Sequence, residues 1–599
     1  MNSIKSEIFS NGKPVSSSII SIDIMSSVNK IPYAQIVVTE GGEKSKSLIE
    51  MSNEACFAPG KEIVISLSQQ TDTATFKGIV VKHNLKRTDK KAFLTIDIKD
   101  KAHTLSLLRE NAVFVNKEDK QIITDIAKKA AVNVECSQST LKHKQIVQYY
   151  CTNWDFIVSR AEANGLLTCV ENGVLKLLKP NLQDSATEIS EIYEYEIEAD
   201  LGAPYGKVES ICWDIQKVKP SKFLNNNQDD LKKEKFKSQQ DYDGLSSVMG
   251  SSKYTLVNGV YGEREEMEAW ANATLMKNRY SLLRGRISLK GNPMLKLGDT
   301  IAIGGLGNMF NGKNLVTGIR HRINSDGWIT DIQCGLSREW FYKNDDIIER
   351  PAAGLLPGIN GLQIGVVEAY PQDGDPDKLY RIKVRIPAIN ETESVIWARL
   401  IFPYAGKGRG IFWVPEEGDE VVVGFFNDDP RHAVILGSLY NGNAQPPLEF
   451  TDKNNEKGMI TRNGIKVIFT DEKDKEKLEV ITPGGNKALF EDENGITVED
   501  KNQNKITLDD QGMSFEDKNK NNIITDDQGV KVEDANKNAM TLNNEGFELK
   551  DLNGNTITLS SAGIEMKDMN GNKVALEASG ITVESAANVT VKGAMINLN

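Results

Sequence analysis

The sequence has few of the residues that enzymes and metal sites most often use. Among 599 residues there are five histidines and six cysteines, and no two cysteines have the C-x-x-C spacing of zinc sites or redox dithiols. The motifs H-E-x-x-H and G-x-S-x-G and the P-loop are also missing. We therefore expect free thiols in a reducing compartment, no catalytic residue, no cofactor and no bound metal ion.

The few candidate nucleophiles and bases have simpler structural interpretations. His143 precedes Cys151 by eight residues, which is only a weak sign of a nucleophile and its base. His321 and His432 lie in or beside alternating strand patterns, where a hydrogen-bonded structural histidine is the commoner case. The many carboxylates towards the C-terminus fall at expected exposed turns, where nothing would separate their pKa values. We therefore predict that the protein is not an enzyme.

Positive charge and long apolar runs are also scarce. The net charge is −12, and the most basic run, residues 232–237, is interrupted by Glu234. Both features argue against a nucleic-acid partner. No window reaches the ~18 apolar residues of a membrane-spanning helix. The N-terminal segment has no apolar run after its first lysine, so we expect no signal peptide and synthesis in the cytoplasm.

What is present indicates a mainly β protein of three regions. The first, residues 1–350, mixes alternating strand patterns with helical spacing at residues 120–132 and 153–166, the second helix stopping at Asn164-Gly165. This mixture predicts an α+β region in which helices accompany small β-sheets.

A third and longer helix is predicted for residues 263–285, with Gly285 as its end, and three strands should follow between glycine turns. A polar insert at about residues 216–255 cannot bury much surface, so we expect a mobile loop there.

The second region, residues 351–447, begins with a Pro/Gly-rich boundary segment and continues as a compact β block. Six short apolar segments between residues 364 and 439 are strand candidates, among them "GIFWVP" at residues 410–415. Five strands of this kind in so short a span suit a small closed barrel such as the OB-fold.

The third region, residues 448–599, is repetitive. Glycines recur every 17 residues, and apolar residues follow each glycine at positions +1, +3, +11 and +13. Two short strands per repeat would each turn one apolar row to the same side, so repeats must stack to form a core. Predicted core residues in two neighbouring repeats are Phe547, Leu549, Ile557, Leu559, Ile564 and Met566.

Such repeats form either a single-chain β-solenoid or a β-prism of several chains. Four apolar residues per repeat make a thin core for one chain, whereas three chains would pool their residues at each level, so we favour a trimer. At the corners we expect Gly or Asn in a left-handed conformation once per repeat.

The corners also raise the question of calcium. Asp-x-Asn-x-Asn at positions +5 to +9 matches the first three ligand positions of an EF-hand loop. Lys505 stands in the first of these loops where such a loop needs glycine, and only Glu545 supplies a glutamate at a twelfth position. We therefore interpret the motif as a turn and not as a metal site.

Several segments resemble one known family. They are "YYCTNWDFIVSRAEANGL" (149–166), "GNPMLKLGDTIAI" with "LVTGIRHRI" (within 291–323), and above all the blocks at residues 361–387 and 397–442, which resemble that family's OB-fold from end to end. The family is that of VgrG, the spike of type VI secretion systems, with the related spikes of extracellular contractile particles and of contractile phage tails.

The resemblance implies a homotrimer. Its hub of tandem barrels would match a hexameric inner tube and contact baseplate proteins, and its three C-terminal segments would form an intertwined β-helical needle. A PAAR-type tip protein would sit on the needle end, for which we single out Met595, Ile596, Asn597, Leu598 and Asn599. Sheath contraction would eject the spike, possible effectors included, through a target membrane, so the action is mechanical.

Two other functions were compared with this one. A trimeric adhesin or tail-fibre-like protein that binds surface glycans would explain the repeats but not the barrel. A polysaccharide-degrading solenoid enzyme would need a site that the sequence does not offer. The sequence leaves open whether the particle is of the type VI or the extracellular kind, and which cargo, target cell and tip protein it has.

Overall fold

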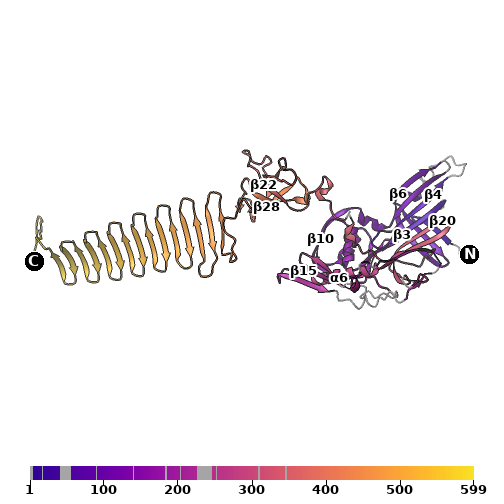
Figure 1. The fold of residues 1–599 in the computed structure, drawn as a ribbon, viewed down its shortest axis with the longest axis horizontal. Helices are drawn as coiled ribbons and strands as arrows, with labels where there is room; N and C mark the ends of the chain where they lie inside the picture. Colours follow the sequence, from indigo (N-terminus) through magenta and orange to yellow (C-terminus); the bar gives the residue numbers. More distant parts are fainter. Residues whose placement is uncertain are drawn as a thin grey trace. The chain divides into compact units, whose positions relative to one another are not determined.

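The chain, seen in a computed structural model, forms two compact units, Met1–Gly354 and Leu355–Asn599, which are described separately. The structure describes all residues except 1–3, 16–17, 41–54, 89–90, 139, 183–184, 190, 201, 203, 225–245, 251–252, 308–309, 345–346 and 599. We call the first unit the hub. Strands dominate both units (Figure 1), which confirms the mainly β fold.

The hub is built on one large sheet. Its strands are β1 (Ile4–Ser10), β2 (Lys13–Pro14), β3 (Ile19–Ser27), β4 (Tyr33–Glu40), β5 (Glu62–Gln69), β6 (Asp72–Arg87), β7 (Ala92–Lys99), β13 (Thr187–Glu188), β14 (Ile192–Ala199), β18 (Leu283–Lys290), β19 (Thr300–Ile303), β20 (Gly312–Asn324) and β21 (Gly327–Cys334). The main path runs β14-β18-β21-β20-β3-β4-β7-β6-β5-β1-β2, and β19 joins β13 to β20.

This sheet has two separate apolar cores, joined through the long strand β20. One core contains Ile36, Ile65 and Ile96, and Ile323 near the end of β20 packs against it. The other contains Ile319 of the same strand. We expected tandem barrels; the described strands form two halves with separate cores that share one continuous ladder, because β20 pairs with β3 of one half and β21 of the other.

A helical part of the hub has its own core. It comprises α2 (Asp119–Lys129), α3 (Asn153–Ala163), the ribbon of β8 (Arg109–Glu118) and β10 (Lys142–Thr152), and the sheet of β9 (Asn133–Cys136), β11 (Leu167–Glu171) and β12 (Val174–Leu178). Ile122 and Ile157 of the two helices meet Leu175 of the sheet. The stop of α3 at Asn164-Gly165 is confirmed, with Gly165 at φ 69°.

The predicted end of the long helix was wrong. Helix α6 (Arg264–Tyr280) ends five residues before Gly285, which instead lies inside β18. A Cβ on Gly285 would stand 2.2 Å from the carbonyl oxygen of Glu196 on β14. The glycine therefore serves the close approach of two strands and does not stop a helix.

The two ends of the polar insert are strands. β16 (Lys219–Leu224) and β17 (Lys253–Asn258) flank β15 (Lys207–Asp214) in a three-stranded sheet. The expected mobile loop falls mainly on residues 225–245, which lie outside the described residues. Short 3₁₀ turns complete the hub: η1 (Ala55–Phe57), η2 (Lys101–Ser106), η3 (Phe341–Lys343) and η4 (Pro351–Gly354).

The second unit begins with a closed five-stranded barrel, as predicted. Its strands are β22 (Gln363–Val367), β23 (Ile382–Arg385), β24 (Val395–Leu400), β27 (Glu420–Phe425) and β28 (Ala433–Leu439), around a core that includes Val384, Val421 and Val423. The turn η5 (Phe426–Asp428) joins the last two strands.

The sixth strand candidate, residues 410–415, was wrong. Only Gly410 belongs to a strand, the two-residue β26 (Arg409–Gly410), which pairs with β25 (Ala405–Gly406) in a small hairpin outside the barrel. Because β24 pairs with β28 and β22 pairs with β27, the barrel closes and has no free edge for a sixth strand.

We call the remaining strands, from Glu456 to Glu584, the needle. They are β29 (Glu456–Ile460), β30 (Lys466–Thr470), β31 (Lys477–Ile481), β32 (Lys487–Glu491), β33 (Gly495–Glu499), β34 (Lys505–Asp509), β35 (Gly512–Glu516), β36 (Asn522–Asp526), β37 (Gly529–Glu533), β38 (Ala539–Asn543), β39 (Gly546–Lys550), β40 (Thr556–Ser560), β41 (Gly563–Lys567), β42 (Lys573–Glu577) and β43 (Gly580–Glu584).

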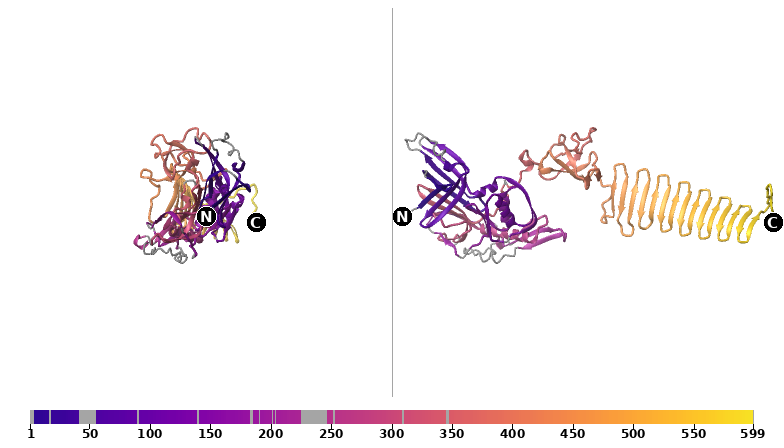
Figure 2. Two further views of the ribbon diagram at one scale, coloured as in Figure 1. Left: turned by 90° about the vertical axis from the view of Figure 1, so that its right-hand side faces the viewer. Right: turned by 180° about the vertical axis from the view of Figure 1, so that it is seen from behind.

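The needle strands form one antiparallel meander, seen as a single row in Figures 1 and 2. Each strand pairs with the next in sequence; a solenoid would instead pair equivalent strands of successive repeats in parallel. Two residues separate Asn543 of β38 from Gly546 of β39, its pairing partner, and so short a link joins antiparallel strands only. The single-chain solenoid is therefore excluded.

One detail of the expected prism needs correction. Each inner strand, β30 to β42, is paired on both edges by its own chain. Strands of three chains therefore do not alternate along this ladder, as an intertwined needle would require. Any association of needles must use the faces of the sheets.

Candidate functional site

The six predicted core residues lie on three consecutive needle strands, β39, β40 and β41. Phe547 pairs with Leu559, and Leu549 pairs with Ile557. The next strand continues the same rows, because Leu559 also pairs with Ile564. Directly paired residues point to the same side of a sheet. The rows therefore form one apolar face, which we call the needle face.

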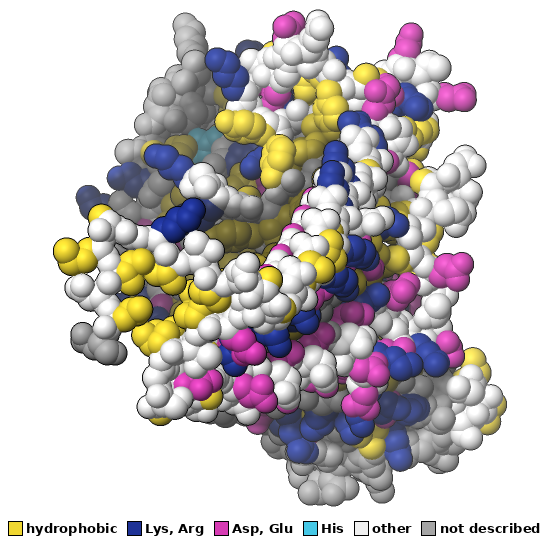
Figure 3. Space-filling model, turned by 90° about the vertical axis from the view of Figure 1, so that its left-hand side faces the viewer, with side chains coloured by type: hydrophobic (Ala, Val, Ile, Leu, Met, Phe, Trp, Pro, Cys, Tyr) yellow, Lys and Arg dark blue, Asp and Glu magenta, His cyan; other side chains and the backbone are white. Residues whose placement is uncertain are grey.

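The needle face is not covered by its own chain. Leu549 is 38% exposed, Leu559 40% and Met566 48%, and in earlier repeats Val498 and Phe515 are 42% and 44% exposed. Figure 3 shows hydrophobic side chains at the surface among charged ones. Apolar rows that continue over many strands mark a surface that associates with another surface. That these residues form the core of an assembly remains our prediction.

Steric constraint explains the 17-residue glycine step. At Gly546 φ is 139°, and a Cβ there would lie 1.9 Å from the carbonyl oxygen of Leu559 on the next strand. Gly495, Gly512, Gly529 and Gly563 have the same overlap, at 1.9–2.0 Å. Gly580 has a similar φ of 131°, but nothing lies within 4 Å of its added Cβ. Glycine is thus required where a further strand follows.

The left-handed residues at the opposite corner of each repeat were predicted only in part. One residue per repeat is left-handed there, but it is Gly in two repeats and Gln or Lys in three, not Gly or Asn throughout. The residues are Gln503, Lys520, Lys537, Gly554 and Gly571. Gln and Lys can adopt this left-handed conformation because hydrogen bonds on both sides hold the corner in place.

Those hydrogen bonds account for the Asp-x-Asn-x-Asn motif. Asp551 Oδ1 accepts the backbone N–H groups of Asn553 (3.0 Å) and Asn555 (2.8 Å), and Oδ2 accepts the Asn555 side-chain amide at 2.6 Å. Corresponding bonds recur at Asp500, Asp517, Asp534 and Asp568. The motif closes a turn, as Asx side chains do elsewhere.

A second bond links each corner to the next repeat. Asn555 Oδ1 accepts the backbone N–H of Met569, 14 residues later, at 3.0 Å. The same contact joins three earlier pairs of corners, at Asn504, Asn521 and Asn538. In the last repeat Asn572 Oδ1 instead accepts the Ser585 hydroxyl at 2.7 Å. The asparagines thus form a ladder along one side of the needle.

Calcium is not expected to bind at these corners. The carboxylate oxygens already accept amide N–H groups, and a cation would have to displace them. The described residues contain no cluster of three or more His, Cys, Asp or Glu side chains that could hold a metal. Calorimetric titration of the full-length protein with calcium should give no saturable heat. A saturable signal near one ion per repeat would contradict this assignment.

The corner aspartates should make the needle sensitive to acid. Hydrogen bonds from the backbone N–H and then the side chain of Asn504 lower the pKa of Asp500 to about 2 from its ordinary 3.8, and similar bonds lower the pKa of Asp551. A depressed pKa contributes stability that is present above the unfolded value and lost as pH falls through the folded one. Stability should therefore fall between about pH 4 and pH 2.

Thermal unfolding of the full chain at pH 5 and pH 2.5, followed by circular dichroism, checks this prediction. A variant with Asn at all five corner Asp positions is the matched control, because Asn cannot titrate. It should show a much smaller change between the two pH values. An unchanged acid sensitivity in the control would assign the effect to other carboxylates.

The candidate nucleophile pair in the hub has another role. His143 Nε2 lies 3.0 Å from Asp119 Oδ2 and 3.1 Å from Arg160 Nη2, inside an ion network between α2, β10 and α3. Burial raises the pKa of the Cys151 thiol, the opposite of nucleophile activation. His321 is buried; its Nδ1 accepts the Trp328 indole N–H at 3.3 Å, and burial lowers its pKa to about 4.

The predicted tip residues stand outside the ladder of strands. Met595 is 79% exposed, Ile596 48% and Leu598 91%. Asn599 lies outside the described residues. The role of this segment in binding a tip partner stays a prediction.

Sequence reasoning missed an aromatic surface on the barrel. Phe412 is 79% exposed and stacks on Phe402 with ring centroids 5.9 Å apart, and Trp413 and Tyr404 are 54% and 52% exposed. The signal was the run of consecutive apolar residues in "GIFWVP", which lacks the alternation of a half-buried strand.

Two models of known families match parts of the chain. A family model described as "Alg8 N-terminal domain" matches residues 1–325, more than half of the sequence. The chain belongs to this family. A second model, "Type VI secretion system/phage-baseplate injector OB domain", matches residues 363–440, the closed barrel.

Curated relatives of this family member confirm the resemblance to VgrG. The spike protein VgrG1b of Pseudomonas aeruginosa is 33% identical over 115 residues, 18% of this chain and 15% of the relative. VgrG1a of the same organism is 28% identical over 158 residues, 24% of each protein. The chain thus spans at most a quarter of the length of these relatives.

Solved structures resemble the chain more weakly. A prophage MuSo2 tail protein from Shewanella oneidensis has a TM-score of 0.43 and 11% identity over 56% of this chain and 98% of that one. A likeness of this size does not bear on function, so the assignment depends on the sequence matches.

Proposed function

We propose that the protein is the spike of a contractile injection system, a homotrimer that acts mechanically. The observation that carries this proposal is an injector-type barrel followed by a sheet with an uncovered apolar face. We propose three functional domains: a hub domain at residues 1–350, an OB-fold domain at 351–447 and a spike domain at 448–599, which contains the needle strands Glu456–Glu584.

The needle geometry favours chains that associate by their faces. Each sheet has a polar side, with Glu548 and Thr558 paired across β39 and β40, and an apolar side with Phe547 and Leu559. Three such sheets around an axis would bury all three apolar sides and leave the polar sides in water. Two sheets packed flat would also bury the faces, so the number three depends on the likeness to the spike family.

The proposed partners follow the same family. The hub would cap a hexameric inner tube and contact baseplate proteins, and a PAAR-type protein would bind near Met595–Leu598. Effectors would travel with the spike, and a target membrane would be pierced mechanically. No helix in the described part of the chain is long and apolar enough to cross a bilayer.

We further propose that the protein is not an enzyme and binds no cofactor and no nucleic acid. It would be made in the cytoplasm, assembled at the particle tip and ejected outside the cell or into a target cell. The inert environments of His143, Cys151 and His321 support the first part of this proposal.

Electron microscopy of purified particles tests the function. A gold-labelled epitope tag on the exposed barrel hairpin should appear at one end of the tube and disappear after contraction. Label along the outside of the particle, together with loss of cell binding when the last ~20 residues are deleted, would contradict the spike and support the adhesin.

A further inference from the structure

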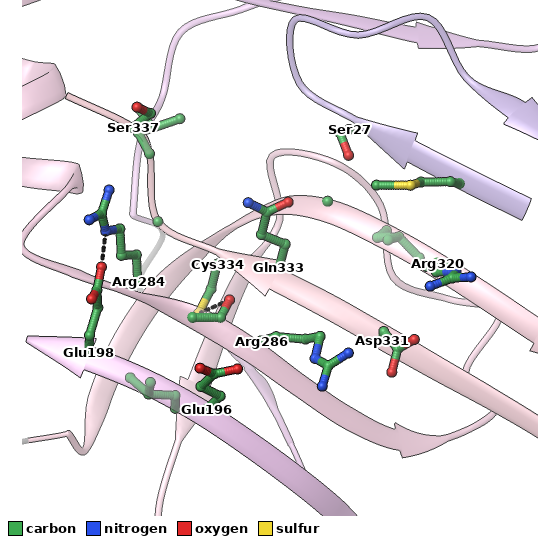
Figure 4. A pocket seen from close by; sticks show the side chains of 17 residues that line it. Ser27, Glu196, Glu198, Arg284, Arg286, Arg320, Asp331, Gln333, Cys334 and Ser337 are labelled. Carbon is green, nitrogen blue, oxygen red and sulfur yellow. Dashed lines mark hydrogen bonds and ion pairs between the residues drawn. The ribbon is translucent and has the colours of Figure 1, made fainter. Parts of the chain in front are cut away.

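A large hollow lies over one face of the hub sheet. It has a volume of about 750 Å³ and spans five neighbouring strands, β14, β18, β21, β20 and β3 (Figure 4). The volume is in the range of ligand-binding clefts. The opposite face of the same strands holds the apolar core around Ile287 and Ile332.

Strand register puts five residues of the hollow in one straight row. Glu196 pairs with Arg286, Arg286 with Gln333, Gln333 with Gly318, and Gly318 with Ser27. Four steps between strands at ~4.8 Å give the row a length of about 19 Å. An extended peptide of about six residues has the same length.

The row has unused hydrogen-bonding capacity. The Ser27 hydroxyl is buried, with the residue 6% exposed, and has no hydrogen-bond partner in the described structure. The side chains of Glu196 and Gln333 also lack a partner among the described residues, and both are exposed. A buried hydroxyl without a partner costs free energy unless something in the hollow pairs with it.

The floor of the hollow has a gap at Gly318. A Cβ at this position would lie 2.9 Å from Gln333 Oε1 and 3.1 Å from Ser27 Oγ. Its φ is not in the left-handed region, so conformation does not require a glycine here. A side chain at this position would fill the space between Gln333 and the Ser27 hydroxyl.

The walls of the hollow are made of charge pairs that are already satisfied. Arg284 pairs with Glu198, and Arg320 pairs with Asp23. Asp331 accepts hydrogen bonds from Arg322 at 2.7 and 2.9 Å. Because the lining carries as many acidic as basic side chains, the hollow suits neither a simple anion nor a simple cation.

Arg286 remains partly available, since its closest carboxylate, Glu194, is 3.4 Å away. No aromatic side chain occurs among the described residues that line the hollow, so stacking of a base or a sugar ring has no platform. A carboxylate, a guanidinium, a carboxamide and a hydroxyl in one row match instead the alternating N–H and C=O groups of a peptide.

We propose that this hollow binds an extended peptide segment of another protein. A Lys or Arg side chain of the segment pairs with Glu196, and its backbone amides bond to Gln333, Arg286 and the Ser27 hydroxyl. The hollow is thus a docking site for a partner protein that is independent of the needle and its face.

Fluorescence anisotropy with two labelled, capped hexapeptides tests the proposal on the full-length protein in its native oligomer. One peptide carries a single lysine among alanines and serines, and the other carries norleucine in its place. The lysine peptide should bind in a salt-dependent manner, and the norleucine peptide should bind about tenfold more weakly, the factor that about 1.4 kcal/mol provides.

Two variants and one control sharpen the test. Glu196→Gln removes the charge that meets the lysine and should weaken lysine-peptide binding about tenfold. Gly318→Ala fills the floor between Ser27 and Gln333 and should weaken both peptides alike. Glu265→Gln, which removes an exposed charge on α6, should change nothing.

Equal binding by all four proteins, or no binding by the unmodified protein, would overturn the proposal. The second result is also what a second copy of this chain covering the hollow would produce. Because the measurement needs no particle, its failure is distinguishable from a failure of the spike assignment, which electron microscopy of the particles tests separately.

Discussion

Replacing Leu549 with Asp is expected to prevent assembly of the needle, whereas Lys550→Asp leaves it intact. Leu549 lies on the needle face, and its neighbour Lys550 points to the opposite side of β39. In a trimer the first change puts three carboxylates at one buried level. An unpaired buried charge costs roughly 3–5 kcal/mol per chain.

Light scattering of the two variants, with thermal unfolding as a second readout, measures this difference. Leu549→Asp should give a lower mass or a much lower midpoint temperature, and Lys550→Asp should behave like the unmodified protein. Equal mass and equal stability of the two variants would mean that the apolar rows do not face other chains.

Replacing Gly546 with Ala is the second change with a large expected effect. The new Cβ would lie 1.9 Å from the Leu559 carbonyl oxygen, so β39 and β40 would have to separate. Loss of that pairing and a φ of 139° together should cost roughly 3 kcal/mol or more.

Gly580→Ala is the matched control for this change. Its φ is 131° and it occupies the same place in the repeat, but no atom lies within 4 Å of the added Cβ. It should therefore show only the conformational cost of about 1–2 kcal/mol. Thermal unfolding monitored by circular dichroism distinguishes the two. Equal destabilisation would show that the backbone conformation, and not the contact with the next strand, requires glycine at this position.

The repeat shows how far sequence reasoning reaches. Alternation within each strand predicted both the strands and the common side of Phe547, Leu549, Ile557 and Leu559. The 17-residue step did not decide between a solenoid and a meander, because both put these positions on one side. The two-residue link before each glycine was the decisive signal, because so short a link can join only antiparallel strands.

Long-range pairing explains most of what could not be predicted. Gly285 looked like a helix stop because its local sequence fits one, and only the approach of β14 shows its actual role. The hollow of the hub joins Ser27 to Glu196 and Gln333 through strand register, and no local pattern in the sequence connects these positions.

The structure of the repeat corners could be predicted from the sequence only in part. Asp-x-Asn-x-Asn was rightly interpreted as a turn, because local side-chain bonds decide such turns. The ladder from Asn555 to Met569 was not foreseen, since it depends on how one repeat stacks on the next.

The mass of the full-length protein in solution tests the central claim most directly. The account requires the needle face to be buried against other copies of the chain. Size-exclusion chromatography with light scattering should therefore give about three times the 66.3 kDa of one chain. A single-chain mass at micromolar concentration, with the needle folded, would contradict the account.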